Sequence, residues 1–393
     1  MRVEVIETEK ALRALEPVWE SLWLADPAAD IFATFAWFLN WWEHFGHSAG
    51  PDVLVMRDGD RWVSLPGRDM RLHVVVVWDQ GEAMAIAPLL LVRGRWRRCP
   101  VRLLVPPLND HAPRSGFLMA RAPRAAVAAV VEYLARSRQW DMLWLDGMPR
   151  QSGLVSVLGE VAARRLRLGR QQPSWSHAYL ALEGTWEQYL KRKSENFRRS
   201  LRRAERALGQ MGTVTVEQYE GPDTVQSTGM QAFIEVDRES WKARDGESIA
   251  LYPHLGAYYG ALATQFAKKN QGEIWLLRIA NEPAAAFLCL CDSRLLYIIK
   301  SSYKEKFGSS QLSPSFVLMA HIVQEAWRRK LIGIDCVGQV PFLERWASAR
   351  IEFDRLVVFG NRFYPGFVRV VDRVMTRVGR AKHALRGWLS RED

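Results

Sequence analysis

The sequence has little cysteine and no long apolar run. It contains four cysteines: Cys99, Cys289, Cys291 and Cys336. They lack histidine partners at zinc-ligand spacing, so we predict reduced core residues and no metal. The longest apolar runs, residues 72–78 and 83–92, are far shorter than the ~20 residues that span a bilayer. The opening MRVEVIETEK lacks a signal-peptide pattern, so the expected location is cytoplasmic.

What is present is an ordinary globular composition with an excess of positive charge. The 393 residues are 48% apolar and 25% charged, which suits two or three domains with ample core. The formal net charge is +11. Such a charge favours anionic partners, namely nucleotide phosphates, nucleic acid or an acidic membrane surface.

Residues 295–338 form the unit on which the functional argument depends. A β-branched and aromatic run at 295–299 predicts a buried strand, a Gly/Ser-rich loop and a helix follow, and a short strand lies at 334–337. The helix opens at Ser313-Pro314, where a serine N-cap and a proline at N1 leave N–H groups facing outward. Phosphate binds well there. The other reading is that Ser313-Pro314 merely caps the helix.

The first half of the chain predicts a strand, two helices and four more strands. These lie at residues 3–6, 10–24, 33–45, 53–56, 72–78, 83–92 and 101–105, and a polar basic segment, 93–98, separates the last two. The second helix, ATFAWFLNWWEHF, is so aromatic that it is either buried in the core or lines an apolar cleft.

A polar stretch, PPLNDHAPR at residues 106–114, follows these strands. Asn, Asp and Pro all favour turns, so one reading is a well-formed turn. The other reading makes His111, beside Asp110, a general base or an acceptor-binding group.

One pattern occurs twice along the chain. A helix at 123–138 leads to a strand at 142–145 that ends before Asp146, and a helix at 316–330 leads to a strand that reaches Asp335. The chain therefore reads as a duplicated domain. The aperiodic segment 170–178, GRQQPSWSH, marks the boundary between the two copies.

The most charged segment is a helix at 187–208. Its apolar stripe consists of Phe197, Leu201, Ala204 and Leu208. Eight lysines and arginines crowd the other positions, with Glu195 and Glu205 as counter-charges. The helix therefore faces either solvent or an anion. Nucleic acid is a weaker reading, because no zinc-finger, RNA-binding or helix-turn-helix signature accompanies it.

The next helix, at 223–241, ends in a cluster of Trp241, Lys242 and Arg244 before Gly246. Such a cluster either holds an anionic or aromatic group or caps the helix with cations. The remaining predicted elements are a strand at 214–218, a helix at 254–268 and strands at 273–280 and 284–291.

Several motifs of the second half belong together. They are SENFRRSLRRA at 194–204, SWK at 240–242 with Arg244 and Gly246, YIIKSSY at 297–303, Ser313-Pro314, and Ile334-Asp335 with Trp346. In these motifs the chain resembles the CelD/BcsL-type acyltransferases, GNAT-superfamily proteins that are also similar to the FemAB peptidyltransferases. The resemblance is firm over about 180–360 and weaker over 1–175, where WDMLWLDGMP and NDHAPR are its best marks.

The resemblance implies an α/β (α+β) fold of two tandem GNAT-like domains, each a mixed central sheet flanked by helices. Residues 1–175 would be a degenerate acceptor-side domain, residues 176–362 a GNAT domain that binds the acyl donor, and residues 363–393 a basic amphipathic helix. The loop at 306–313, KFGSSQLS, is longer than the usual GNAT pyrophosphate signature and has one glycine, which leaves the donor's identity open.

The implied chemistry is acyl transfer, in which an amine or hydroxyl attacks a thioester carbonyl. The site then needs a base, a donor to the developing oxyanion and a pocket that aligns both substrates. The candidate bases are Glu239, His111 and Asp335, in that order. Tyr303 would donate to the oxyanion or to the leaving thiolate, and the strand at 295–301 would pair with the pantetheine arm.

The resemblance also implies binding residues, with acyl-CoA as the donor substrate and no metal. The donor would contact Lys300, Ser301, Gly308, Ser309, Ser310, Ser313 and Ser315. The acceptor would contact Asn109, Asp110, Trp241, Lys242 and Arg244.

The C-terminal segment at 366–389 predicts a basic amphipathic helix. Its apolar positions are Phe367, Val371, Val374, Val378, Ala381, Leu385 and Trp388, and six arginines and lysines fill the other faces. One reading is a helix docked on its own domain. In the other, the helix lies on an anionic leaflet, where each basic residue contributes ~1 kcal/mol.

We therefore predict an acyl-CoA-dependent N- or O-acyltransferase of a bacterial envelope pathway, in the cytoplasm or peripheral on the inner face of its membrane. The acceptor would be an exopolysaccharide precursor, or a lipid amine such as the sphingoid base that a related group of GNAT-like ceramide synthases acylates. The alternatives are FemAB-like transfer from aminoacyl-tRNA, for which the basic helix would bind RNA, and a non-catalytic scaffold at a polysaccharide synthase. The oligomeric state stays open.

Overall fold

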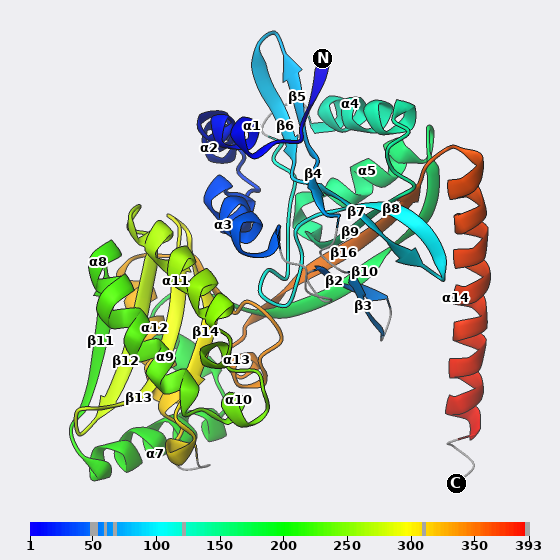
Figure 1. The fold of residues 1–393 in the computed structure, drawn as a ribbon. Helices are drawn as coiled ribbons and strands as arrows, with labels where there is room; N and C mark the ends of the chain where they lie inside the picture. Colours follow the sequence, from blue (N-terminus) through cyan, green and yellow to red (C-terminus); the bar gives the residue numbers. More distant parts are fainter. Residues whose placement is uncertain (48–53, 59–60, 66–68, 120–122, 309–311, 390–393) are drawn as a thin grey trace. The chain divides into compact units, whose positions relative to one another are not determined.

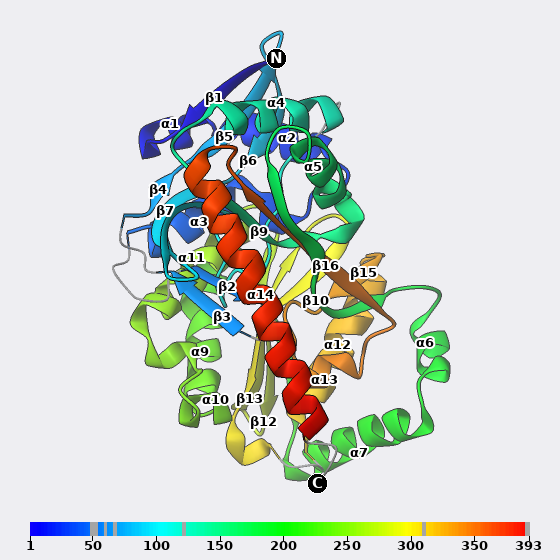
Figure 2. The same cartoon turned by 90° about the vertical axis from the view of Figure 1, so that its right-hand side faces the viewer.

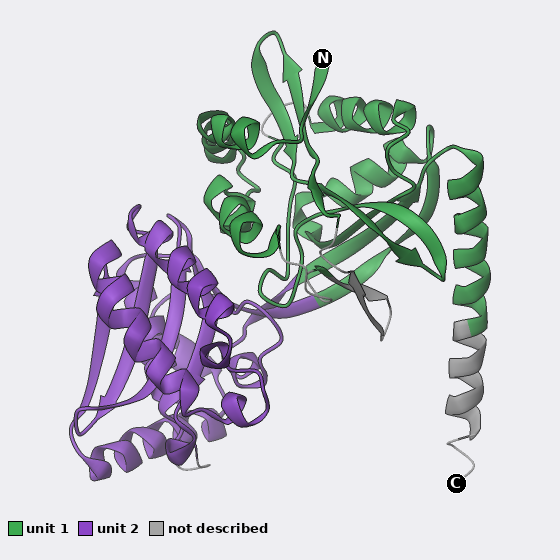
Figure 3. Cartoon of the chain, viewed as in Figure 1, with its two compact units in different colours: residues 1–175, 352–393 green, residues 176–351 purple. Residues whose placement is uncertain are grey.

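The computed structural model describes residues 1–47, 54–58, 61–65, 69–119, 123–308 and 312–389 (Figure 1). The chain forms two compact units, unit 1 with residues 1–175 and 352–393 and unit 2 with residues 176–351 (Figure 3). It passes from unit 1 into unit 2 within strand β10 (Arg167–Ala181) and returns within β16 (Ala349–Phe359). Each unit has a mixed sheet flanked by helices, which confirms the predicted fold class.

Unit 1 is built on strands in the order β10-β16-β9-β8-β7-β4, with a three-stranded sheet β1-β5-β6 and a hairpin β2-β3. The strands are β1 (Arg2–Ile6), β2 (Leu54–Asp58), β3 (Arg61–Leu65), β4 (Arg71–Leu72), β5 (Val74–Asp79), β6 (Glu82–Ala87), β7 (Leu90–Trp96), β8 (Cys99–Val105) and β9 (Met142–Pro149). The helices are α1 (Glu9–Ala14), α2 (Glu16–Ala25), α3 (Phe35–Phe45), α4 (Pro123–Arg136), α5 (Leu154–Ala162) and α14 (Phe363–Leu389), with short 3-10 turns at Ile31–Ala33 and Arg150–Ser152. Apolar side chains of α4 and α5 pack on these strands as one core.

Unit 2 has the strand order β11-β12-β13-β14-β15-β10. Figure 2 labels β12, β13, β15 and β10 of this sheet. Its strands are β11 (Val214–Glu220), β12 (Gly272–Ile279), β13 (Glu282–Cys291), β14 (Leu295–Tyr303) and β15 (Gly333–Asp335). Its helices are α6 (Trp186–Arg192), α7 (Glu195–Met211), α8 (Pro222–Thr224), α9 (Met230–Arg238), α10 (Trp241–Arg244), α11 (Pro253–Ala267), α12 (Pro314–Arg328) and α13 (Pro341–Glu344), with a π-turn at Val225–Gly229 and 3-10 turns at Ile249–Leu251 and Glu305–Phe307.

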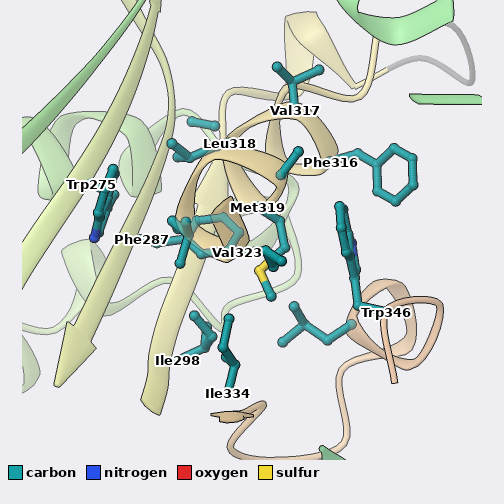
Figure 4. Close-up of a cluster of buried hydrophobic side chains, with 14 of the residues drawn as sticks. Trp275, Phe287, Ile298, Phe316, Val317, Leu318, Met319, Val323, Ile334 and Trp346 are labelled. Atoms are coloured by element: carbon teal, nitrogen blue, oxygen red, sulfur yellow. The ribbon is translucent and has the colours of Figure 1, made fainter. Parts of the chain in front are cut away.

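The core of unit 2 explains the periodicity of its helices. The predicted stripe of α7 is buried, and it packs with α12 in one core against β12, β13 and β14. Figure 4 shows the α12 part of this core beside Trp275, Phe287 and Ile298 of those strands. Phe197, Phe316 and Trp346 meet there with ring centroids about 5 Å apart. The residues of α7 that do not face this core are mostly exposed, as an amphipathic helix requires.

The helix predicted at 10–24 is two helices, α1 and α2. The break lies at Leu15, whose N–H bonds the carbonyl of Leu12. Pro17, in the first turn of α2, has no N–H to offer the carbonyl of Arg13, so a continuous helix would lose a bond there.

The basic segment predicted to separate two strands is itself part of a hairpin. Residues 93–96 belong to β7, and Trp96 lies opposite Cys99 of β8. Arg97 and Arg98 form the turn between them with φ values of 49° and 68°, the conformation that two-residue hairpin turns require. The polar character of the segment therefore reflects an exposed strand edge and not a loop.

The segment at 170–178, predicted as an aperiodic boundary, is the middle of β10. The chain does pass from one unit to the other there, between Trp175 and Ser176, but it does so as a strand. The C-terminal division also differs from the expected one. The second domain was expected to reach residue 362, whereas residues 352–393, which include most of β16 and all of α14, belong to unit 1. Residues 353–359 pair with β9, and this ladder places them in unit 1.

The aromatic helix α3 is mostly core. Trp37, Trp41 and Trp42 are at most 4% exposed, but Trp42 also borders a surface pocket together with Glu9 and Arg102. Two cysteines, Cys289 and Cys336, are buried as predicted, while Cys99 and Cys291 are half-buried. None of the helices in the described part of the chain offers the apolar length that a bilayer crossing requires.

Candidate active site

Strands β14 and β15 pair in parallel over three residues only. The pairs are Leu295 with Gly333, Leu296 with Ile334 and Tyr297 with Asp335. β15 then ends, while β14 continues to Tyr303 and stays paired with β13 on its other side. Among the described residues, the last six of β14 therefore have no ladder partner on the side that faced β15. This edge can accept an extended ligand that carries amide groups.

The pairing of β14 with β13 contains an irregularity at the start of this open edge. Leu288 lies opposite Lys300 and Cys289 opposite Ile298, so the register passes over Ile299. A bulged residue has no place in the ladder of its partner strand. The backbone around Ile299 can therefore turn an N–H group toward a ligand on the open edge.

Helix α12 begins just beyond β14, and its first turn is unusual. Ser313 has φ 41° and ψ 60°, a left-handed conformation that is costly for a residue other than glycine. Its side chain makes no capping bond, so the predicted serine N-cap is wrong in that respect; Pro314 does occupy the first helical position. The Ser313 carbonyl instead accepts from the N–H of Phe316 at 2.9 Å.

The next residue, Ser315, adds a buried polar group to this helix start. Its side chain is 7% exposed, and its hydroxyl has no hydrogen-bond partner among the described residues. A buried hydroxyl without a partner costs about 1–3 kcal/mol unless a ligand supplies the bond. Together with the positive end of the dipole of a 15-residue helix, it makes the start of α12 suited to an anion.

The far end of β14 is held by a network around Asp237, which is 2% exposed. The Ser302 hydroxyl donates to Asp237 Oδ1 at 2.8 Å, and the Ser248 hydroxyl donates to Oδ2 at 2.6 Å. The Lys242 ammonium donates to the carbonyl of Ser301. Burial lowers the pKa of Lys242, while Asp237 and Glu247 oppose that shift. The predicted acceptor residue Lys242 and the predicted donor residue Ser301 are thus in contact, and the lysine stabilises the end of β14.

Lys304 follows β14 and joins it to two neighbouring elements. Its ammonium, 3% exposed, donates to Glu235 at 2.8 Å, Glu239 at 3.0 Å and Glu282 at 3.2 Å. Burial alone would lower the pKa of Lys304. The hydrogen bonds that its ammonium donates to these carboxylates outweigh burial, so the pKa is raised. Glu239, the first candidate base, is therefore held in an ion-pair cluster at the end of the strand.

Asp335, the third candidate base, lies where the two strands part. It is fully buried, and its Oδ1 is 2.6 Å from Nε2 of His177, which is fully buried as well. His177 comes from β10, the other neighbour of β15. Sequence patterns do not reveal this histidine, because the aperiodic segment 170–178 predicts a boundary between domains and not a strand.

The structure locates the other residues predicted in unit 2. The ideal Cβ of Gly308 would lie 2.6 Å from the Tyr303 ring, so only glycine fits beneath that tyrosine. Lys300 lies over the ring of Tyr259, 5.2 Å from its centroid. Arg244 pairs with Asp245 and Glu305, and Trp241 opens the short helix α10. Ser309 and Ser310 lie outside the described residues.

The residues predicted between 106 and 114 belong to unit 1, and the turn reading fits them. Asn109 Oδ1 accepts from the N–H of His111 at 3.0 Å and of Ala112 at 2.8 Å. The ring of His111 stacks on Phe45 with centroids 6.0 Å apart, and Asp110 is exposed. These predicted residues thus belong to unit 1, and the strand pair β14–β15 belongs to unit 2.

Comparisons with known proteins agree with this geometry. Residues 195–345 match the family model described as an acetyltransferase (GNAT) domain. FemX has a similar solved structure, with a TM-score of 0.54 at 11% identity over 90% of this chain and 97% of that one. A conserved protein of unknown function from Bacteroides thetaiotaomicron is similar, with a TM-score of 0.53 at 10% identity over 91% of this chain and 100% of that one. No curated protein matches the sequence. The family match, which lies within unit 2, supports an acyltransferase with a GNAT domain there, and the similar solved structures show the shared fold.

Proposed function

We propose that the protein is an acyl-CoA-dependent N- or O-acyltransferase whose donor lies along the open edge of β14. One observation carries the proposal: β14 and β15 pair over three residues and β14 then continues alone on that side. The amide groups of pantetheine would complete the ladder, and the pyrophosphate would meet the start of α12, where the Ser315 hydroxyl lacks a partner among the described residues.

The reaction forms a bond from the acceptor nitrogen or oxygen to the acyl carbon and breaks the carbon–sulfur bond of the thioester. The acceptor's proton goes to a base, and the thiolate leaves with a proton from an acid. The N–H released by the irregularity at Ile299 would stabilise the oxyanion. Tyr303 was the predicted acid, but at ~3.3 Å per residue it lies about 13 Å along β14 from Ile299, so we do not assign its phenol to the leaving thiolate.

The position of the carbonyl decides between the candidate bases. Because a strand rises ~3.3 Å per residue, Lys304 and its partner Glu239 lie roughly 16 Å along the chain from Ile299. Asp335, paired in register with Tyr297, is far nearer to the thioester position. We therefore propose Asp335 with His177 as the base, since a carboxylate beside an imidazole stabilises the imidazolium.

The acceptor is proposed from the resemblance and the charge of the chain. An envelope-related amine or hydroxyl, such as an amino lipid or a polysaccharide precursor, fits a protein of net charge +11 that works near anionic surfaces. Peripheral binding to the inner face of the cytoplasmic membrane belongs to the same proposal.

Calorimetric titration with acetyl-CoA, a long-chain acyl-CoA and free CoA tests the donor. We expect saturable binding, tightest for the long chain, and a loss of at least about 10-fold in Ser313→Asp, because the new carboxylate repels the phosphates. Asp tolerates the left-handed conformation of residue 313, so the fold should survive. Arg124→Asp, at the second helical position of α4 in unit 1, is the matched control and should bind normally. Unchanged affinity in folded Ser313→Asp would contradict the assignment.

A second function, aminoacyl transfer from charged tRNA, draws on one feature of α7. Arg199, Arg202 and Arg206 are exposed on the side of the helix that faces away from the core. If this face binds tRNA, affinity should fall steeply with salt, because each phosphate contact releases counterions. Salt-sensitive tRNA binding without acyl-CoA binding would favour aminoacyl transfer. A folded protein that binds neither donor would favour a non-catalytic scaffold.

A further inference from the structure

Helix α14 is attached to unit 1 by one face. Val368 and Asp372 are at most 2% exposed, and Asp372 Oδ1 accepts from Trp96 Nε1 at 2.9 Å. Arg97 and Arg170 each approach the same oxygen at 3.4 Å. These contacts bind the helix to the β7–β8 hairpin and to β10, so its orientation on unit 1 is fixed by buried charge.

The opposite face of α14 carries exposed apolar side chains. Their exposed fractions are Phe363 88%, Phe367 50%, Val370 58%, Val374 53% and Val378 44%. With about 100° between successive residues, these five positions fall within a sector of roughly 80° whose centre is about 160° from Asp372. We call them the apolar stripe. The helix therefore does not use this stripe for docking on unit 1, contrary to what a docked amphipathic helix would do.

Two arginines lie on one side of the apolar stripe. Arg373 and Arg377 are exposed, and by the same helical spacing Arg377 lies about 20° and Arg373 about 60° from the edge of the stripe. From Arg373 to Leu389 the sequence of α14 has no aspartate or glutamate. An apolar band bordered by arginine and free of carboxylates complements a surface that is apolar inside and anionic outside.

We propose that the apolar stripe and its arginines bind an anionic lipid surface, with the stripe inserted at the level of the acyl-chain boundary. A second copy of the chain is a poorer occupant, because two identical faces would bring their arginines together. The contacts of Asp372 hold the stripe away from unit 1 and spare the protein the cost of ordering the helix on binding. This surface is independent of the donor site on β14.

Co-sedimentation of the full chain with vesicles tests the proposal. We expect binding to vesicles of 30% phosphatidylglycerol in phosphatidylcholine, little binding to pure phosphatidylcholine, and a loss of at least about 10-fold in the triple variant Phe367→Ser, Val370→Ser, Val374→Ser. Leu24→Ser, which changes an apolar side chain that is 76% exposed in α2, is the matched control and should bind as the parent does.

The separate role of charge is tested with Arg373→Glu and Arg377→Glu together, which should weaken binding to anionic vesicles and leave the little binding to neutral ones unchanged. Each variant should keep its affinity for acyl-CoA, so failure of the lipid surface and failure of the donor site give different results. Equal binding by the triple variant and the parent would overturn the proposal. A dimer that the triple variant abolishes, with no vesicle binding by the parent, would also overturn it and assign the stripe to a second copy.

Discussion

The two units contain the same crossover, a strand, a helix and a second strand parallel to the first. In unit 1 the elements are β8, α4 and β9, and in unit 2 they are β14, α12 and β15. β8 runs one residue past its last pair with β9, and Pro106 and Pro107 follow. Proline cannot donate to a ladder, so the edge closes there. In unit 2, β14 runs six residues past its last pair, which leaves an edge open for a ligand.

The second strand of each crossover carries a buried aspartate, and the partners differ. Asp146 of β9 accepts from Arg355 at 2.6 Å and 3.0 Å, and Arg355 is 2% exposed. Asp335 of β15 faces His177 at 2.6 Å. A guanidinium never gives up its proton at physiological pH, whereas an imidazole does. We infer that the ion pair of unit 1 holds its scaffold, whereas the carboxylate–imidazole pair of unit 2 is suited to passing a proton in the reaction.

The largest expected effect follows from removing the guanidinium of unit 1. Arg355→Met leaves the Asp146 carboxylate buried without its counter-charge, which should lower the free energy of unfolding by about 3–5 kcal/mol. Urea unfolding measures the loss. Arg150→Met removes an exposed arginine from its pair with Asp354, and its loss should be much smaller. Equal losses in the two variants would show that the buried pair has no special role, and donor affinity should change in neither.

The corresponding change in unit 2 should alter the rate. Asp335→Asn keeps the size of the side chain but cannot stabilise an imidazolium, so we expect kcat to fall about 100-fold while acyl-CoA affinity is unchanged. Release of CoA thiol in the presence of a long-chain amine measures the rate, and the acid limb of its pH profile should shift or disappear. Asp146→Asn is the matched control in unit 1 and should cost stability without this change in profile. An Asp335→Asn enzyme that is destabilised yet turns over at the parent rate would make the pair structural.

Sequence patterns predicted the features that depend on neighbours along the chain. The repeat of apolar residues in α7 and α12 identified both helices and their buried faces, and the repeated helix-strand order predicted the crossover that both units contain. The partners of buried charges could not be predicted in this way. His177 meets Asp335, and Lys304 meets Glu235, only after distant strands and helices come together.

The donor site illustrates the same limit. The positions of β14 and α12 follow from local periodicity, and Pro314 was placed correctly at the helix start. The left-handed Ser313 and the buried hydroxyl of Ser315 do not follow, because both depend on how the loop meets the core. Likewise, Gln-Gln-Pro-Ser within β10 has the composition of a loop and forms a strand because its neighbours supply the ladder.

The last expected effect is the pH dependence of the free energy of unfolding, through a buried histidine of unit 1. His73 is fully buried, its Nε2 lies 3.0 Å from the Tyr133 hydroxyl, and burial lowers its pKa to about 4. The unfolded chain takes up this proton near the ordinary value of 6.5, while the folded chain resists it. Its contribution to stability is therefore complete above pH 6.5 and is lost as the pH falls toward 4, by at most about 1.4 kcal/mol per pH unit and about 3 kcal/mol in all.

Substitution of His73 should remove this pH dependence. Glutamine can keep a bond to Tyr133 but has no proton to gain, so His73→Gln should flatten the plot of unfolding free energy against pH between 6.5 and 4. The exposed His254 of unit 2 provides the control, and His254→Gln should leave the plot as it is in the parent. The measurement is urea unfolding at a series of pH values. Parallel plots for His73→Gln and the parent would show that acid weakens the protein through other groups, and that unit 1 does not depend on a neutral His73.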